Sequence, residues 1–427
     1  MNEKLQAEFE KATGYQLTDD HIERNRLLLG IDVPNPDDEQ IHTASIDNIR
    51  TFAFGCGNDN PLHCDPEYAA GTRWGSVIAP NMMAGSINKP LKGDPLDPEI
   101  KKQQKGVFRG IHVFISGGEW TFYRPIYPGD TIFSFKALES LEVQPSEFAG
   151  RKVNRITRVV KINQRSEIVG VYRYREILTE RKTAVKKGKY LEIEPARYSD
   201  QDIARIDEIY ANDRPRGADT WYFEDVKEGE SLRPSVSGPL TVSDVITFHA
   251  GGYGWVPYGL RVGRLWHKNR QRIPAFYIKN ESGIPDVAQR LHWDSQWARA
   301  IGNPIAYDYG VMRENYLYRY LSDLAGDDGW VYSTYDEIRK FNYIGDTQFI
   351  EGSVIGKRQE HGLHLVDVKV SMTNQRGEET VRCKATIALP CRNGSPVILP
   401  EAPDDLRRRA VSMWTRHCEL TQRSKTG

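Results

Sequence analysis

The segment "RPIYPGDTIF" at residues 124–133 has a counterpart later in the same chain, "FNYIGDTQFI" at residues 341–350. Each is followed by a second shared string, "INQRSE" at 162–167 and "TNQRGEE" at 373–379. In both copies a Gly-Asp pair precedes an apolar run, which is typical of a strand entered from a turn. Landmarks repeated in the same order indicate that the chain contains an internal duplication.

A further pair of segments extends the duplication upstream. "HCDPEYAAGTRWGSVIAP" at 63–80 and "HWDSQWARAIGNPIAYDYG" at 292–310 both contain His-x-Asp, an alanine, a glycine and then Ile-Ala. A chain of 427 residues is long enough for two such domains. The expected organisation is an N-terminal domain at 1–190, a linker at 191–214, a C-terminal domain at 215–400 and a basic helical tail at 401–427. Within the linker, the apolar spacing predicts a helix from Asp200 to Tyr210.

Each half has the same expected order of elements. Capping and stop signals predict a short helix in "TASIDNIRTFAFGCG" at 43–57 and in "LTVSDVITFHAGG" at 240–252. A polar loop with a histidine follows, and then a second helix, in "PNMMAGSINKPL" at 80–91 and "YGVMRENYLYRYLSDLAG" at 309–326. Four strands are expected after each second helix, at 118–126, 130–141, 155–164 and 168–178 and at 333–343, 347–357, 363–375 and 379–390. A helix followed by an antiparallel meander, repeated, predicts an α+β fold.

The composition excludes several classes of protein. The 58 basic and 58 acidic residues cancel, so the chain lacks the charge expected of a nucleic-acid binder. No run of 18 apolar residues predicts a membrane span, and the N-terminus lacks the apolar core of a signal peptide. The five cysteines are odd in number and lack CxxC spacing, which argues against disulfides and a zinc site. We therefore expect a cytoplasmic protein with no nucleic-acid or membrane partner, no metal and no cofactor.

One string resembles a known family. Gly57-Asn58-Asp59-Asn60-Pro61-Leu62-His63-x-Asp65, with Ala69 and Ile78-Ala79-Pro80 behind it, is similar to the hydratase motif of MaoC-like (R)-specific enoyl-CoA hydratases. The first half also resembles the fungal fatty-acid-synthase-type dehydratase branch, and 307–330 resembles the second unit of tandem acyl dehydratases. The resemblance implies a double hotdog, in which two antiparallel sheets lie side by side and each wraps a central helix.

The resemblance also implies a chemistry: hydration of an enoyl thioester, or dehydration of a 3-hydroxyacyl thioester. Such a reaction needs a base, an acid and a hydrogen-bond donor for the enolate oxygen. In the family, an aspartate and a histidine supply the acid and base. The first backbone N–H of the central helix is the expected oxyanion donor.

Both halves depart from the family motif. In the second half, His292 is retained, Asp286 precedes it by six residues, and Gly310 stands at the helix start. Because a glycine there permits close approach to a thioester oxygen, we expect the working site in this half, with Tyr307 and Tyr309 lining the acyl tunnel or packing in the core.

The first half offers an alternative pair, His63 with Asp59, because Asn58 occupies the family's carboxylate position. Asn81 replaces the usual helix-start glycine there, and Asn58, Asn60 and Asn81 are candidate substrate contacts. Working sites in both halves, or in neither, also remain open. The polar residues of this loop could instead only cap short helices and form turns.

A basic segment at 261–272 could hold the substrate's carrier. Arg264, Lys268 and Arg270 would suit the phosphates of coenzyme A or the acidic face of an acyl carrier protein, although a solvated surface loop has the same pattern. Two other functions stay open: a hotdog thioesterase, and a non-catalytic subunit that binds acyl thioesters. A homodimer of double hotdogs is a further possibility.

Overall fold

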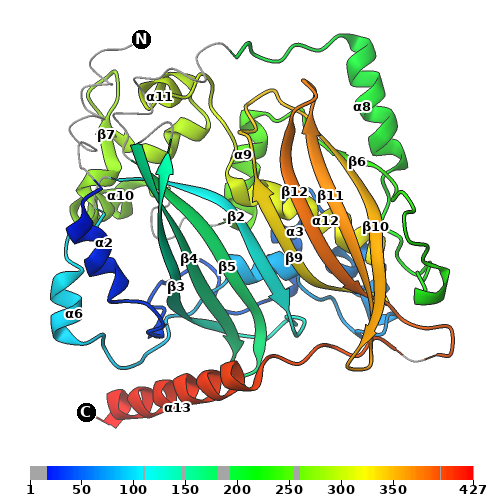
Figure 1. Ribbon diagram of the computed structural model, residues 1–427, viewed down its shortest axis with the longest axis horizontal. Coiled ribbons are helices and arrows are strands. Elements are labelled where there is room, and N and C mark those ends of the chain that lie inside the picture. The colour runs from blue at the N-terminus through cyan, green and yellow to red at the C-terminus, as the bar shows by residue number, and fades with distance from the viewer. Residues whose placement is uncertain are drawn as a thin grey trace.

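The computed structural model describes residues 17–108, 111–146, 150–179, 193–253, 260–394 and 396–426. Its main feature is a ten-stranded antiparallel sheet in the order β1-β3-β4-β5-β2-β9-β12-β11-β10-β6 (Figure 1). The order on one side of the β2–β9 contact mirrors the order on the other. The first half supplies β1 (Val33–Pro34), β2 (His112–Phe122), β3 (Ile132–Ser146), β4 (Gly150–Asn163) and β5 (Ile168–Thr179). The second supplies β6 (Ser235–Ser237), β9 (Trp330–Ile338), β10 (Gln348–Glu360), β11 (Leu363–Asn374) and β12 (Glu379–Ala388).

The sequence predicts two antiparallel sheets side by side, and in the structure the two units join edge to edge in one sheet. Strands β2 and β9 pair at Glu119↔Tyr335, Trp120↔Thr334 and Thr121↔Ser333. This pairing satisfies backbone groups that two isolated sheets would expose along their edges. The α+β prediction and all eight predicted strands are confirmed, with bounds shifted by a few residues.

The central helices differ between the halves. In the second half, α12 (Gly310–Ala325) forms as expected and packs on β9 and β12. In the first half, the expected helix is wrong: residues Asn81–Gly85 form only a short 3-10 turn, η1.

The chain after η1 bonds to neighbouring backbone instead of to itself. Asn88 N donates to Ile41 O at 3.0 Å, and Lys89 N donates to Ile132 O at 2.7 Å. Leu91 N donates to Asn35 O at 3.1 Å. These bonds satisfy the groups that a helix would have paired, and Pro90 cannot donate within a helix. The apolar pattern of 80–91 therefore reflects burial of an extended segment.

The capped helices before the histidine loops meet through two glycines. They are α3 (Ile46–Gly55) and α9 (Val242–Phe248), with π-helical turn η3 (His249–Tyr253) continuing α9. A Cβ added to Gly55 would lie 2.4 Å from the Cα of Gly251, and one added to Gly251 would lie 2.3 Å from the Cα of Gly55. The backbones can approach this closely only because both positions lack a side chain.

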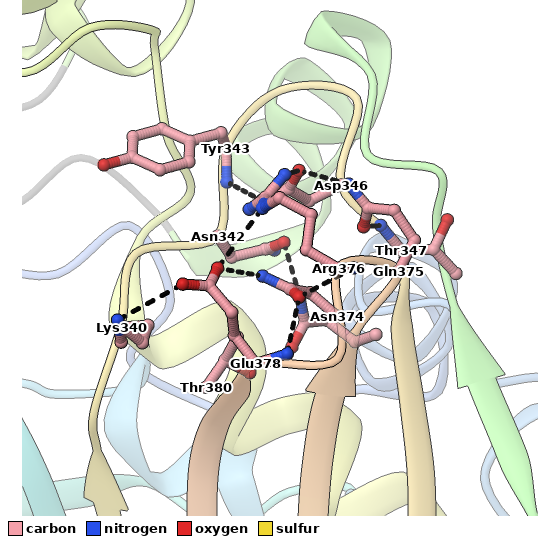
Figure 2. Close-up of polar contacts among 11 residues, drawn as sticks. Lys340, Asn342, Tyr343, Asp346, Thr347, Asn374, Gln375, Arg376, Glu378 and Thr380 are labelled. Atoms are coloured by element: carbon pink, nitrogen blue, oxygen red, sulfur yellow. Dashed lines mark hydrogen bonds and ion pairs between the residues drawn. The ribbon is translucent and has the colours of Figure 1, made fainter. Parts of the chain in front are cut away.

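A buried aspartate network fixes the Gly-Asp turn in each half, and Figure 2 shows the network of the second half. Arg376 binds Asp346 through two bonds of 2.6 and 2.7 Å, and Gln375 donates to the same carboxylate at 2.8 Å. Asp346 in turn accepts from Tyr343 N at 3.0 Å. Bidentate arginine pairs of this kind fix geometry as well as adding energy. The network therefore ties the β11–β12 turn to the loop before β10.

The same network recurs in the first half around Asp130. That carboxylate accepts from Tyr127 N at 3.0 Å, from Gln164 at 3.0 Å and from Arg165 at 3.1 Å. All residues of this network lie within the two repeated strings of the first half. The internal duplication read from "GD" and "NQR" is thus a duplication of structure.

Other elements connect or cover these parts. The helices and turns are α2 (Asp19–Arg26), α4 (Pro61–Cys64), α5 (Pro66–Ala70), α6 (Pro98–Gln103), α8 (Asp200–Asn212), η2 (Phe223–Asp225), α10 (Gly263–Arg272), η4 (Pro274–Phe276), η5 (Ala288–His292), α11 (Ser295–Ala300) and α13 (Asp404–Thr426). A small hairpin pairs β7 (Tyr277–Lys279) with β8 (Pro285–Val287). The linker helix expected from Asp200 is α8, whereas the domain boundaries stay predictions and partly fall outside the described residues.

The C-terminal helix α13 packs on its own chain. Figure 1 shows α13 beside the first-half strands. The Trp414 ring lies 5.0 Å from the Phe133 ring, and Arg416 binds Asp94 at 2.9 Å. The basic amphipathic pattern of this tail predicts a docking or subunit contact rather than a membrane anchor. In the structure its apolar face covers strands of the first half. In the described part of the chain, no helix combines the length and hydropathy needed to cross a membrane.

We expect Gly55→Ala to lower the free energy of unfolding by about 1–3 kcal/mol, the usual cost of forcing extra atoms into a packed contact. Thermal and denaturant unfolding would measure the loss. Gly356→Ala is the matched control because a Cβ there meets nothing within 4 Å. Equal stability of the two variants would contradict the glycine contact.

Candidate active site

The two motif histidines occupy equivalent positions. Nδ1 of His63 lies 2.8 Å from the carbonyl oxygen of Ile78, and Nδ1 of His292 lies 2.8 Å from that of Tyr307. In each case the carbonyl belongs to the residue 15 positions later. Tyr307 therefore corresponds to Ile78, and Gly310 corresponds to Asn81. The Ile-Ala match seen in the sequence is therefore out of register by two residues, since Ile305 and not Tyr307 aligns with Ile78 in that match.

The carbonyl contact defines the state of each ring. A carbonyl oxygen can only accept, so Nδ1 carries the hydrogen and Nε2 keeps the basic lone pair. Burial lowers the pKa of His63 and that of His292 to about 4 in each case. Both rings are therefore neutral at pH 7. His63 is almost fully buried, and its Nε2 has no hydrogen-bond partner among the described residues, whereas His292 is partly exposed.

The N-terminus of α12 begins beside His292. Gly310 is its first residue, and the preceding Tyr309 does not cap the helix with its side chain. A Cβ at Gly310 would lie 2.8 Å from Cδ1 of Ile338. The position thus favours glycine, and the uncapped helix start offers backbone N–H groups and a favourable dipole to a negatively charged oxygen.

An aromatic group surrounds His292. The Tyr309 ring lies 3.7 Å from the His292 ring, and the Tyr307 ring lies 5.0 Å from it. The hydroxyl of Tyr309 is 2.9 Å from Nε2 of His249, a buried residue at the end of α9. Both tyrosines are buried. The sequence predicts only a packing or surface role for His249, because no motif around it marks it as part of this site.

Asp286 does not join His292 in the structure. It lies on β8, where its carboxylate accepts from Val287 N at 2.8 Å and pairs with Arg290 at 3.0 Å. Arg290 also binds Asp294 and Glu281. No contact between Asp286 and His292 occurs among the described residues, so the expected dyad is not assembled.

The first-half loop is organised by its amides. Asn58 is buried and accepts from Asn60 N at 3.0 Å, while Asn60 donates to Asp323 of α12 at 3.0 Å. Burial raises the pKa of Asp323 to about 7. Asp59 is exposed. The alternative pair of Asp59 with His63 is therefore not formed by any contact in the described residues, and the loop follows the capping interpretation.

Asn81 marks the clearest difference between the halves. It is buried at the start of η1, and its side-chain Nδ2 has no hydrogen-bond partner among the described residues. The corresponding residue of the second half, Gly310, begins a helix of 16 residues. The dipole of a full helix therefore acts at Gly310 and not at Asn81.

The basic segment forms α10, which is carried by the insertion that leads into His292. Arg264 and Lys268 are exposed, and the Arg270 guanidinium lies 3.6 Å from the centre of the Trp266 ring. None of these three cations makes an ion pair within the described residues. The sequence also predicts that an insertion from Trp255 to Gly283 could roof a pocket, but residues 254–259 lie outside the described ranges. In those ranges, no three His, Cys, Asp or Glu side chains gather as a metal-binding group.

Comparison with known proteins identifies the class of fold. A MaoC-like dehydratase superposes on 86% of this chain and 99% of its own, with a TM-score of 0.54 and 16% identity. A conserved hypothetical protein of Mycobacterium tuberculosis, described as having a double hotdog fold, covers 86% of this chain and 97% of its own, with a TM-score of 0.47 and 12% identity. The chain therefore shares the α+β hotdog fold of the MaoC-like dehydratase, with two mirrored halves in one sheet.

The sequence comparisons match part of the chain. Residues 31–169 match the model of the FAS1-like dehydratase domain region. A UPF0336 protein of Streptomyces avermitilis is 29% identical over 97 residues, which are 22% of this chain and 61% of that relative, less than two thirds of its length. The resemblance to MaoC-like dehydratases is thus confirmed, with the family-model match lying in the first half.

Both motif imidazoles should remain neutral far below the usual titration range. The folded pKa of about 4 lies below the ordinary value of 6.5, so each ring resists protonation while the fold persists. Nitrogen-15 NMR between pH 7 and 5 should show Nδ1-protonated neutral rings for His63 and His292. Stability contributed by the neutral rings is complete above pH 6.5 and declines as the pH falls toward 4. Protonation of either ring near pH 6.5 would contradict this.

Proposed function

We propose that this chain is an acyl-thioester hydro-lyase, which hydrates an enoyl thioester or dehydrates a 3-hydroxyacyl thioester. Two findings support the proposal: the match of residues 31–169 to a dehydratase model, and the hotdog fold. The observation that carries it is the position of His292, whose neutral ring is fixed by Tyr307 beside the uncapped start of α12. A base and an oxyanion donor are thereby offered at one place.

In the proposed reaction, the thioester oxygen binds at the Gly310 N–H. That donor and the helix dipole stabilise the negative charge when the enolate forms. Nε2 of His292 removes the proton from the α-carbon during dehydration and returns it during hydration. Tyr307 and Tyr309 line the acyl side of the site, with the Tyr309 hydroxyl held by His249.

The second half is favoured for the working site because its helix start is complete. A donor must approach the developing oxyanion to about 2.7–3.1 Å. Glycine leaves that approach open, whereas the Asn81 side chain of the first half adds bulk at the equivalent place. In this proposal the first half serves as the wall that encloses the acyl group.

We expect His292→Ala to lower kcat for hydration of crotonyl-CoA by about 10²–10⁴-fold, the range for loss of a positioned acid or base. His63→Ala should retain a substantial fraction of activity. Loss of the enoyl absorbance measures hydration, and a thiol reagent measures hydrolysis in parallel. Thermal unfolding controls for the burial of His63, with His63→Gln as a second variant.

The opposite pattern, an inactive His63 variant beside an active His292 variant, would move the site to the first half. Release of free thiol would identify a thioesterase instead. Asp286→Asn should leave most of the activity, because Arg290 and not His292 holds that carboxylate.

The carrier of the acyl group is proposed to bind at α10. Arg264 and Lys268 are four residues apart on one helix face, and the segment 245–280 contains no acidic residue. Phosphates of coenzyme A or acidic side chains of a carrier protein would form ion pairs with these cations. Arg270, stacked on Trp266, would contribute from beside them.

Reversing the charge of Arg264 and Lys268 together, each to Glu, should raise KM for the thioester severalfold and leave kcat nearly unchanged. The wild-type KM should also rise with salt, because exposed charges are screened. Lys101→Glu with Lys102→Glu on α6 is the control, since these lysines are equally exposed. An identical KM in both double variants would contradict a role for α10.

A further inference from the structure

Two buried carboxyl groups lie at the seam where β2 meets β9. Glu314 projects from α12 and is 5% exposed, and Asp336 projects from β9 and is 2% exposed. Neither makes an ion pair among the described residues. Burial raises the pKa of Glu314 well above its usual value, with a further contribution from Asp336, and burial raises the pKa of Asp336 to about 7. Two buried carboxyls without an ion-paired cation are costly to ionise together, so the pair retains a proton at neutral pH.

The pair lies next to the proposed oxyanion site. Glu314 is four residues beyond Gly310, so both face the same side of α12, about 6 Å apart along the axis. A Cβ at Gly310 would face Ile338 of β9 and Ile115 of β2. A Cβ at Gly118, three residues further along β2, would lie 3.1 Å from Oε1 of Glu314. This side of α12 therefore lies along the seam from Gly310 inward to the carboxyl pair.

Two consecutive glycines make room for the pair. A Cβ at Gly118 would also lie 3.0 Å from the hydroxyl of Tyr172, and one at Gly117 would lie 2.1 Å from the carbonyl oxygen of Asp336. Gly117 has a φ of 131° beside a bulge in the β2–β5 pairing. Gly118 N donates to the Asp336 carboxylate at 3.3 Å. Strand β2 is thus irregular beside the acidic groups, and at Gly117 and Gly118 only its backbone contacts them.

The remaining neighbours are hydrogen-bond donors and aromatic rings. The Tyr172 hydroxyl of β5 donates to Glu314 at 2.9 Å, and the Trp120 ring stacks on Tyr172 at 4.4 Å. Two cations lie nearby: Arg313 pairs with Asp308, and Arg175 donates to the backbone carbonyl of Asp336. The charge of Arg175 lowers the pKa of both carboxyl groups, but burial has the larger effect and raises it. The other titratable neighbours are Tyr174 of β5 and Cys383 of β12.

The proposed site lacks a carboxyl group at the place where the motif would supply one. Counting five residues back from each histidine gives Asn58 in the first half and Val287 in the second. Asp286 is held by Arg290. Dehydration nevertheless requires a proton for the departing hydroxyl group, and a neutral imidazole at His292 can only accept one.

We propose that Glu314 is the acid that protonates the leaving hydroxyl of a 3-hydroxyacyl thioester bound at Gly310. The inference rests on the proposed hydro-lyase function. His292 takes the α-proton, and the C–H electron pair moves onto the thioester oxygen as an enolate. The enolate then re-forms the thioester carbonyl, the C3–O bond breaks, and the hydroxyl leaves as water with the proton of Glu314. His292 afterwards returns its proton to the carboxyl pair, and hydration takes the same steps in reverse.

Glu314→Gln tests the proposal through crotonyl-CoA hydration. We expect kcat to fall by about 10²–10⁴-fold with little change in KM, as for loss of a positioned acid or base. The wild-type kcat should decline as the pH rises past the point where the pair loses its proton, and this alkaline limb should be absent from the residual activity of the variant. Glu337→Gln is the matched control, because Glu337 is the next residue of β9 and is partly exposed.

Tyr172→Phe provides a second test that keeps the ring and the packing. The tyrosine hydrogen bond favours the ionised carboxylate, so its removal should raise the pKa of the pair and move the alkaline limb to higher pH. A purely structural role would change the melting temperature without moving this limb.

The outcomes separate the two proposals. Wild-type protein that hydrates no enoyl thioester would overturn the proposed function and the inference together. Active wild type with a folded Glu314→Gln variant of equal kcat and unchanged pH profile would overturn only the role of Glu314. Loss of activity and of the alkaline limb in that variant, with the Glu337→Gln control unaffected, is the result we expect.

Discussion

The pairing of β2 with β9 is the contact on which the rest of the molecule depends. Three residue pairs join the edges of two five-stranded units into one sheet. They also bring Gly118 of the first half against α12 and Asp336 of the second. Without this edge contact, the Tyr172 hydroxyl could not form its hydrogen bond with Glu314. The interior of the molecule is therefore built jointly, and its buried polar groups belong to neither half alone.

The hydrogen bond from each motif imidazole to a carbonyl 15 residues later shows how the duplication was kept and changed. The local geometry is the same around His63 and His292, down to the bond length of 2.8 Å. The next segment of each half differs, with a single 3-10 turn in one and a helix of 16 residues in the other. The backbone path is kept, but the helix start differs. The second half has a helix dipole and an open approach to Gly310, whereas the first half has a closed loop lined by amide side chains.

Much of the fold could be read from the sequence because its signals are local. Alternating apolar residues defined the strands, and the Gly-Asp turns with their downstream Asn-Gln-Arg strings revealed the repeat. The absence of a central helix from the first half could not be predicted, because an extended segment buried between strands has the same apolar content as a helix. The backbone bonds of Asn88, Lys89 and Leu91 decide the matter, and their partners are remote in sequence.

The site was predictable only in part, for a similar reason. His292 and Gly310 stand in a motif, and their role in the working site stays a prediction. Asp286 is only six residues from His292 in sequence, but on β8 its carboxylate pairs with Arg290. His249 and Glu314 carry no motif, and tertiary packing alone brings them to Tyr309 and Tyr172. Spacing along the chain therefore indicates the residues that belong to a repeated motif. It does not indicate residues that meet only through contacts between different helices and strands.

The meeting of Gly55 with Gly251 has a consequence for how a fused duplication can evolve. In an assembly of two identical units, one substitution at such a point would appear on both sides of the contact and collide with itself. Fusion turns the single position into two positions that can mutate separately. Both glycines still face the same narrow space, so a side chain at either one is tolerable only if the two backbones move apart. Divergence is thereby directed to the helix starts and loops, where the halves already differ.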